Sequence, residues 1–275
     1  MGFSAVQKFA RVIGLDRDVG YALGSRIATA GGQFVTLALV ALLMSAPAQG
    51  YHFTFLAFTA LQHFFELGFY VVLVNTAAHE WAHLSLGADG GAEGPERPLD
   101  RLASLLRLSL RWYGGASFVF VIAVLAGGWW FFASRPQTGI DWHLPWVCFV
   151  FAAGLNIWGN CALSFLEGCG QVAESYRIRL MAAITGQASA IVVLISGAEL
   201  WVAVTAIGVT AAAQIILAAR LHLPLFQTLL ARKPAQGLSW RADLWPLQWR
   251  IALQSIAGGV CVSMFVPVAF YYHGP

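Results

Sequence analysis

Long apolar stretches, separated by short polar or Gly- and Pro-rich segments, dominate this 275-residue chain. Seven of them are long enough to be membrane spans, at residues 21–46, 52–78, 112–133, 144–166, 178–197, 199–219 and 247–272. A helix needs roughly 20 predominantly apolar residues to cross the hydrocarbon of a bilayer. The pattern therefore predicts an all-α membrane protein with seven transmembrane helices.

The positive charges fall almost entirely on one side of these segments. Of the 16 Lys and Arg residues, Arg135 alone lies in a loop on the opposite side, which leaves 15 on the first side. Lys and Arg accumulate in the cytoplasmic loops of membrane proteins. We therefore expect a cytoplasmic amino terminus, and seven spans then place the carboxyl terminus outside.

The composition agrees with a membrane protein. Hydrophobic residues make up 59% of the chain and charged residues 11%, and the mean hydropathy is +0.68. A soluble domain is about 45 to 50% apolar and about 25% charged. The net charge of +3 is therefore a topology signal, and we expect no nucleic-acid partner, because the basic residues are scattered over four segments.

The spans divide the chain into four parts. Residues 1–20 are expected to form a cytoplasmic interfacial segment, and residues 21–230 a six-helix transmembrane bundle. Residues 231–246 are expected to be a cytoplasmic linker, and residues 247–275 the first helix of a second, incomplete bundle. The linker and the loop at 85–100 concentrate Gly, Pro and charge, so we expect both to bury too little surface to pack.

The seventh segment repeats the beginning of the first. Ser25–Ala28 (SRIA) opens the first segment, and Trp249–Ala252 (WRIA) opens the seventh. An even number of crossings between two copies gives them the same orientation, as in transporters built from parallel repeats. The expected fold is a six-helix bundle plus a seventh helix that begins a second, parallel repeat.

Glu66 lies near the middle of the second span. Thr59, Gln62 or His63, Glu66 and Tyr70 recur every three or four residues, so on a straight helix they form one polar stripe. An ionisable group at this depth costs several kcal/mol unless it faces a cavity or a partner. Two interpretations stay open: Glu66 is protonated and ties two helices together, or it lines a transport cavity with Gln62.

The fourth span carries a second set of polar residues. Asn156, Asn160 and Glu167 are four and seven residues apart and share a helix face. Asn side chains also join membrane helices by hydrogen bonds worth about 0.6 to 2 kcal/mol, so both a cavity and a helix contact are possible roles. Gln33 and Gln187 are further polar groups within spans, and we rank them lower.

Arg26 and Arg250 lie near the starts of the first and seventh spans. One interpretation is that both side chains extend to the cytoplasmic headgroups. The other is that both guanidinium groups turn inward and bind a phosphate or diphosphate with two hydrogen bonds each. Their matching places in the two proposed repeats favour the second interpretation.

Residues 79–83 match the H-E-x-x-H zinc motif. In that motif two histidines one helical turn apart bind the metal and the glutamate activates water, which here would be His79, His83 and Glu80. A third ligand would have to come from one of four carboxylates, at Glu93, Glu96, Glu167 or Glu174. A zinc metallopeptidase is therefore the alternative function, and a helix end with a coincidental pentapeptide is the interpretation that we favour.

Several short motifs resemble the polysaccharide flippase branch of the multidrug, oligosaccharidyl-lipid and polysaccharide exporter superfamily. They are Arg26 in the first helix, the turn at 48–51 (AQGY), the second helix at 61–69 (LQHFFELGF), the run at 77–82 (AAHEWA) and the fourth-helix exit at 165–173 (FLEGCGQVA). This resemblance implies two six-helix bundles that rock about a central cavity. Because this chain carries one bundle and one further helix, it resembles the amino-terminal part of such a transporter.

The resemblance also implies a function and its partners. Family members move lipid-diphosphate-linked oligosaccharides across the bacterial plasma (inner) membrane. By resemblance, Arg26 and Glu66 would line one half of the cavity and Arg250 would open the other. Membrane lipids, a coupling proton or sodium ion, and envelope polysaccharide polymerases or glycosyltransferases are the further partners implied.

Flipping by alternating access requires no covalent chemistry. We therefore assign no catalytic residue and expect no cofactor. A third possibility beside the flippase and the peptidase is a structural subunit that scaffolds enzymes of envelope-polymer synthesis.

Overall fold

The computed structural model describes residues 17–134, 140–235, 237–263 and 268. The helices in this part of the chain are α2 (Arg17–Leu43), α3 (Ala46–Thr59), α4 (Gln62–Glu66), α5 (Phe69–Trp81), α6 (Glu96–Ala133), α7 (His143–Gly168), α8 (Val172–Ile195), α9 (Trp201–Leu221), α10 (Leu223–Ala231), the π-helix η1 (Trp240–Leu244) and α11 (Trp245–Ser263). Strands β1 (Ser85–Leu86) and β2 (Ala92–Glu93) form a small antiparallel hairpin. Most of the expected segment 1–20 lies outside the described residues.

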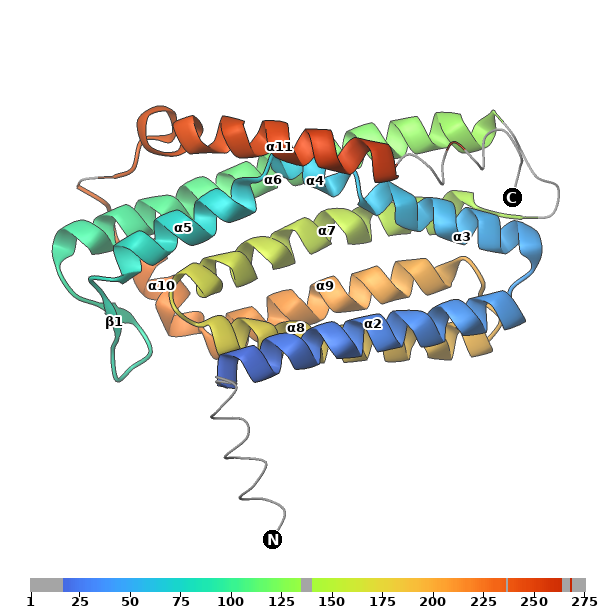
Figure 1. Cartoon of the computed structure of the whole chain (residues 1–275), viewed down its shortest axis with the longest axis horizontal. Helices are drawn as coiled ribbons and strands as arrows, with labels where there is room; N and C mark the ends of the chain where they lie inside the picture. Colours follow the sequence, from blue (N-terminus) through green and yellow to red (C-terminus); the bar gives the residue numbers. More distant parts are fainter. Residues whose placement is uncertain (1–16, 135–139, 236, 264–267, 269–275) are drawn as a thin grey trace, which may run out of the picture.

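The long helices lie side by side along the length of the molecule (Figure 1). The helix α8 packs between α2 and α9, and α7 packs against α9, α6 and α5, while α11 lies on α4 and α5. Half of the apolar stretch of α7 is buried, against 28% in α6, α8 and α9, so α7 is the central helix. The helices α2 and α11 run in the same direction on opposite sides of the bundle (Figure 1).

Among the described residues, four helices, α6 to α9, are long and apolar enough to cross a membrane, and there are five if the bent pair formed by residues 46–66 and 69–81 is one span. Large apolar side chains are exposed on the outer surface of the bundle, with exposed fractions of 72% at Trp130 of α6 and of 78% and 72% at Leu42 and Phe34 of α2. Such surfaces are stable when the solvent is hydrocarbon rather than water. The structure is that of an all-α, multi-pass membrane protein, while the count of seven spans stays a prediction.

The second predicted span is not a continuous helix. Residues 46–66 and 69–81 meet at an angle of 51°. Leu67 and Gly68 both adopt left-handed backbone conformations, with φ of 50° and 65°. A side chain at Gly68 would collide with Ile251 of α11, so glycine is needed here both for its conformation and for the close approach of α11. The prediction of one straight helix over 52–78 is wrong because the chain turns at these two residues.

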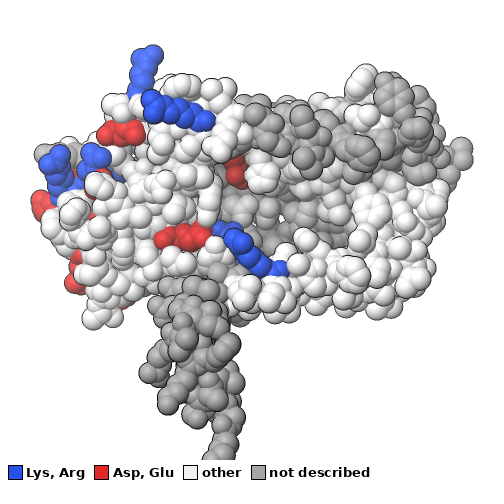
Figure 2. Space-filling view, viewed as in Figure 1, with Lys and Arg blue, Asp and Glu red and all other residues white. Residues whose placement is uncertain are grey.

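The charged side chains gather toward one end of the molecule. Figure 2 shows Lys, Arg, Asp and Glu over the left and central parts of this face, while its right-hand third shows none among the described atoms. The left-hand end contains the turn from α5 to α6, the hairpin and α10 (Figure 1). We call this end the arginine-rich end, because Arg97, Arg101 and Arg107 of α6 and Arg232 after α10 lie there.

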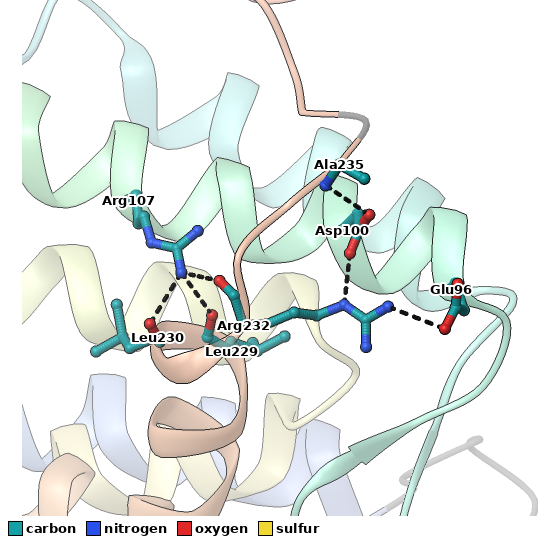
Figure 3. Close-up of polar contacts among 7 residues, drawn as sticks. All are labelled: Glu96, Asp100, Arg107, Leu229, Leu230, Arg232 and Ala235. Atoms are coloured by element: carbon teal, nitrogen blue, oxygen red, sulfur yellow. Dashed lines mark hydrogen bonds and ion pairs between the residues drawn. The ribbon is translucent and has the colours of Figure 1, made fainter.

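The segment 231–246 is packed, contrary to the prediction that it would bury too little surface. Arg107 of α6 donates hydrogen bonds to the carbonyl oxygens at the end of α10, of which the bond to Leu230 is 2.8 Å long. Asp100 of α6 binds the Arg232 guanidinium and accepts a 2.9 Å bond from the backbone N–H of Ala235 (Figure 3). Side chains of α6 thus bind the backbone that follows α10.

Aromatic stacking anchors the same segment further along. The ring of Trp240 stacks on Trp112 of α6, with centroids 4.7 Å apart, and on Phe69 of α5 at 5.1 Å. Leu244 is fully buried. The loop at 85–100 also has more structure than expected, because it forms the hairpin and the first turn of α6. Composition alone predicted too little packing for both segments, because their few apolar residues, such as Ala92 and Leu244, are buried.

Candidate functional site

Two adjoining cavities lie between the helices. The first has a volume of about 700 Å³ and is lined by residues of α2, α3, α4, α7, α8 and α9. The second has a volume of about 540 Å³ and lies between α4, α5, α6, α7 and α8, nearer the arginine-rich end. His63 and Asn160 line both. The two cavities therefore adjoin each other at these two side chains.

Uncharged polar side chains line much of the first cavity. They are Thr29, Gln33, Thr36, His52, Thr59, Gln62, His63, Asn156, Asn160, Gln187 and Thr210. Gln62 donates to the carbonyl oxygen of Ala153 at 2.9 Å and accepts from Asn156 at 3.4 Å, so Asn156 both lines the cavity and joins two helices. The side chain of Gln187, which the sequence ranked low, accepts a 2.7 Å bond from Thr36.

The second cavity holds an ion pair. Glu167 of α7 accepts a hydrogen bond from the Tyr70 hydroxyl at 3.1 Å and pairs with Arg179 of α8 at 3.3 Å. The side chain of Glu167 is only 8% exposed, so this charge is largely removed from solvent. The guanidinium of Arg179 lies 6.0 Å from the centre of the Tyr176 ring. In the sequence Arg179 is one of the basic residues that give the charge asymmetry, and its spacing of 12 residues from Glu167 does not indicate a pair.

Glu66 also lines the second cavity but in a different environment. The residue is 9% exposed. Within the described part of the chain, its carboxylate has no hydrogen bond or ion pair, while its backbone oxygen accepts a 3.3 Å bond from the Trp112 indole. The cavity therefore contains one neutralised carboxylate, Glu167, and one without a partner in the structure, Glu66.

The residues of the predicted polar stripe line the cavities, but they do not lie on one straight helix. Thr59 and Gln62 line the first cavity, Glu66 and Tyr70 line the second, and His63 lines both. The helix breaks at 60–61 and again at 67–68. The straight-helix argument for the stripe is therefore wrong, although the structure brings these residues to the two adjoining cavities that Asn156, Asn160 and Glu167 also line.

Arg26 and Arg250 do not line either cavity. Both are exposed. Arg26 lies on α2, and the Arg250 guanidinium lies 5.6 Å from the centre of the neighbouring Trp249 ring. The structure therefore brings neither arginine into contact with Glu66 or Glu167, and a role in binding phosphate stays a prediction for both.

The residues of the zinc motif serve a different contact in this structure. Glu80 is 4% exposed and accepts a 2.7 Å bond from Nε of Arg101. Nη2 of the same arginine lies 3.7 Å from the Asp243 carboxylate. The rings of His79 and His83 are 6.3 Å apart. Among residues whose placement is described, no group of three His, Cys, Asp or Glu side chains could hold a metal ion. The side chains present therefore do not fit the zinc site of a metallopeptidase.

Comparison with known proteins gives no family for this chain. No family model, curated protein or solved structure matches it. The resemblance to polysaccharide flippases therefore remains a hypothesis that depends on the residues alone.

Proposed function

We propose that this protein takes part in moving a lipid-diphosphate-linked oligosaccharide across the bacterial plasma membrane by alternating access. The observation that carries the proposal is the pair of adjoining cavities, each lined in part by polar side chains, inside a bundle whose outer face is apolar. An amphipathic substrate needs both surfaces, because its sugar must stay in a polar passage while its lipid tail stays in hydrocarbon.

The lining of the first cavity supports a sugar as the polar part of the substrate. Amide, hydroxyl and imidazole groups donate and accept hydrogen bonds without a fixed charge, as sugar hydroxyls require. Phe53 and Leu56 add apolar surface to the same lining. A volume of about 700 Å³ lies within the range of small-molecule sites, which is about 300 to 1,000 Å³.

A row of residues on α2 supports Arg26 as a phosphate ligand. Thr29, Gln33 and Leu37 line the first cavity. Arg26 precedes Thr29 by three residues and so continues this row toward the arginine-rich end. At this position its guanidinium would meet the diphosphate outside the cavity while the sugar lies within it, and Arg250 of α11 would supply a second cation.

The orientation follows from the positive-inside rule. We propose that the arginine-rich end faces the cytoplasm, with the amino terminus on that side. A proton or sodium gradient would drive the cycle, and the enzymes that build and polymerise the oligosaccharide would supply and consume its substrate.

Flipping can be measured in proteoliposomes with a fluorescent, polyprenyl-diphosphate-linked N-acetylglucosamine. A membrane-impermeant quencher reports the fraction of probe in the outer leaflet. We expect the protein to increase the rate above that of protein-free vesicles. Asn160→Leu removes the amide shared by both cavities and should reduce the rate about tenfold, as expected for the loss of one or two hydrogen bonds.

Asn75→Leu is the matched control, because Asn75 is an exposed residue of α5 outside both cavities. Its rate should equal that of the wild type. Equal rates in protein-containing and protein-free vesicles would contradict the proposal, and so would equal losses in the two variants. A metallopeptidase would instead bind stoichiometric zinc that is lost in His79→Ala. A scaffold would leave polysaccharide output unchanged in Arg26→Gln and Glu66→Gln cells.

A further inference from the structure

The carboxylate of Glu66 is placed inside the membrane bundle without a balancing charge. It faces the second cavity, it is 9% exposed, and no described side chain binds it. Glu167 in the same cavity is bound by Tyr70 and Arg179. An unpaired buried carboxylate is so costly that it takes up a positive charge or loses its own.

The break in the transmembrane helix places this carboxylate at the end of a helical stretch. The helical stretch 46–66 ends at Glu66, and Leu67 and Gly68 turn away in left-handed conformations. The last carbonyl groups of a helix lack intrahelical donors and carry partial negative charge. In transporters such broken-helix ends bind coupling ions. Here the helix α4 has only five residues and the Glu66 carbonyl oxygen already accepts a bond from the Trp112 indole, so the carboxylate is the group at this break without a described partner.

The groups around Glu66 leave this charge uncompensated. Arg179 is the cation among the residues that line the second cavity, and it pairs with Glu167 rather than Glu66. The titratable and charged groups on the elements packed around Glu66 are His63 on α4, Tyr70 on α5, Tyr113 on α6, Cys161 and Glu167 on α7, Tyr176 and Arg179 on α8, and the exposed Arg250 on α11.

We propose that Glu66 is the residue that binds and releases the coupling proton, exchanging it with water in the second cavity. This inference rests on the proposed transport function, and it assigns the driving ion to one side chain. A proton needs only one carboxylate oxygen, whereas a metal cation needs several oxygen ligands. The other carboxylate of the cavity is already occupied, which favours the proton over sodium.

The coupling has a structural route. Glu66 is followed directly by Leu67 and Gly68, and Gly68 packs against Ile251 of α11. The helix α11 belongs to the second proposed repeat. Loss of the negative charge at Glu66 removes the electrostatic cost of enclosing it, so protonation favours the conformation in which the second cavity is closed from water.

The first test measures the proton itself and does not depend on transport. Infrared spectroscopy of the full chain in lipid follows the carbonyl stretch of protonated carboxylic acids as the pH changes. We expect a titrating band that disappears in Glu66→Gln, is retained in Glu66→Asp and is unchanged in Glu93→Gln. Glu93 is the matched control, because it is an exposed carboxylate in the hairpin.

The second test measures coupling with the fluorescent lipid-linked sugar. In wild-type vesicles, a difference of one pH unit should change the leaflet distribution of the probe by up to about tenfold for each proton coupled. In vesicles with the Glu66→Gln variant, a pH gradient should not change the leaflet distribution of the probe. A response to a sodium gradient at equal pH, or a titrating band and a gradient response that both survive in Glu66→Gln, would overturn the assignment.

The two tests separate the two proposals. A titrating Glu66 band in a protein that flips no probe would refute the proposed substrate and keep the proton site. Flipping that is normal in rate and independent of pH in the wild type would support the transport function and refute the coupling by Glu66.

Discussion

Replacing Gly128 by alanine tests how tightly α6 packs against α7. Gly128 faces the indole ring of Trp146, which is fully buried. This ring is held by other aromatic side chains, with centroid distances of 5.0 Å to Phe55 and 5.1 Å to Phe58 and Phe132. It therefore has little room to retreat from a new methyl group.

The expected cost follows from the geometry. A Cβ atom at Gly128 would overlap Cζ2 of Trp146 and lie 2.6 and 2.8 Å from Cε2 and Cη2, whereas carbon atoms pack at about 3.5 to 4.0 Å. Such overpacking costs about 1 to 3 kcal/mol. The neighbouring Gly127 has no atom within 4 Å of its Cβ position. Both variants gain the same helix propensity, about 1 kcal/mol, so Gly128→Ala should be less stable than Gly127→Ala by about 1 to 3 kcal/mol.

Unfolding of the two variants in lipid–detergent micelles with increasing sodium dodecyl sulfate, followed by circular dichroism, gives the two free energies. The difference should shrink in a Trp146→Phe background, which removes the obstructing ring atoms. Equal stability of Gly127→Ala and Gly128→Ala, within about 0.5 kcal/mol, would refute the packing that the structure shows.

Three further predictions concern groups near the arginine-rich end. Arg101→Ala should lower the free energy of unfolding by about 1 to 3 kcal/mol in the same assay, because it leaves the buried Glu80 unpaired, and adding Glu80→Gln should recover part of the loss. Burial lowers the pKa of His222, so the unfolded chain takes up a proton first as the pH falls. Stability should therefore decrease below the ordinary pKa of about 6.5, and a pH series of unfolding curves should flatten in His222→Gln. Trp240→Ala removes a stacked ring and should accelerate trypsin cleavage within 231–246 compared with the wild type, whereas unchanged cleavage would show that the stacking does not anchor this segment.

The central helices are the part of the fold that the sequence predicts best. The predicted spans at 144–166 and 199–219 correspond to α7 and α9 with ends that differ by one or two residues. Each is a continuous apolar run bounded by charged or interfacial residues, so hydropathy defines it. The predicted span at 112–133 covers only the second part of α6. Residues 96–111 are also helical, but they form an amphipathic helix with one polar and one apolar face. Hydropathy detects the apolar part of a helix, so it does not detect the polar first part of α6.

The break at Leu67 and Gly68 could not be read from hydropathy. A leucine with positive φ costs roughly 1 to 2 kcal/mol relative to a helical one, and no local pattern signals it. The conformation is explained by contacts from elsewhere, namely Ile251 packed on Gly68 and Trp112 bound to the Glu66 carbonyl. Long-range contacts decide this local structure. The polar residues could therefore be predicted from the sequence, whereas the break that positions them could not.

The ion pair of the second cavity shows the same limit. Glu167 was expected from its face on the fourth span, but Arg179 and Tyr176 lie on the next helix, where single residues carry no periodic signal. The chain reverses at Cys169–Gln171, and only this turn brings Arg179 back to Glu167. The polar residues of a site can be found from the cost of burying them, whereas their partners depend on how the helices meet.

The arginines at this end of the molecule serve two purposes that a charge count cannot separate. Arg101 and Arg179 neutralise buried carboxylates. Arg107 of α6 binds the end of α10, and Arg232, which follows α10, binds Asp100 of α6. Arg97 is exposed and contributes to the charge asymmetry without such a contact among the described residues. Replacing Arg107 by Gln should therefore weaken the docking of this segment, and Arg97→Gln should not, although the two changes are identical for the positive-inside rule. The structure thus separates the arginines that hold helices and segments together from those, such as Arg97, for which a role in orientation is the remaining prediction.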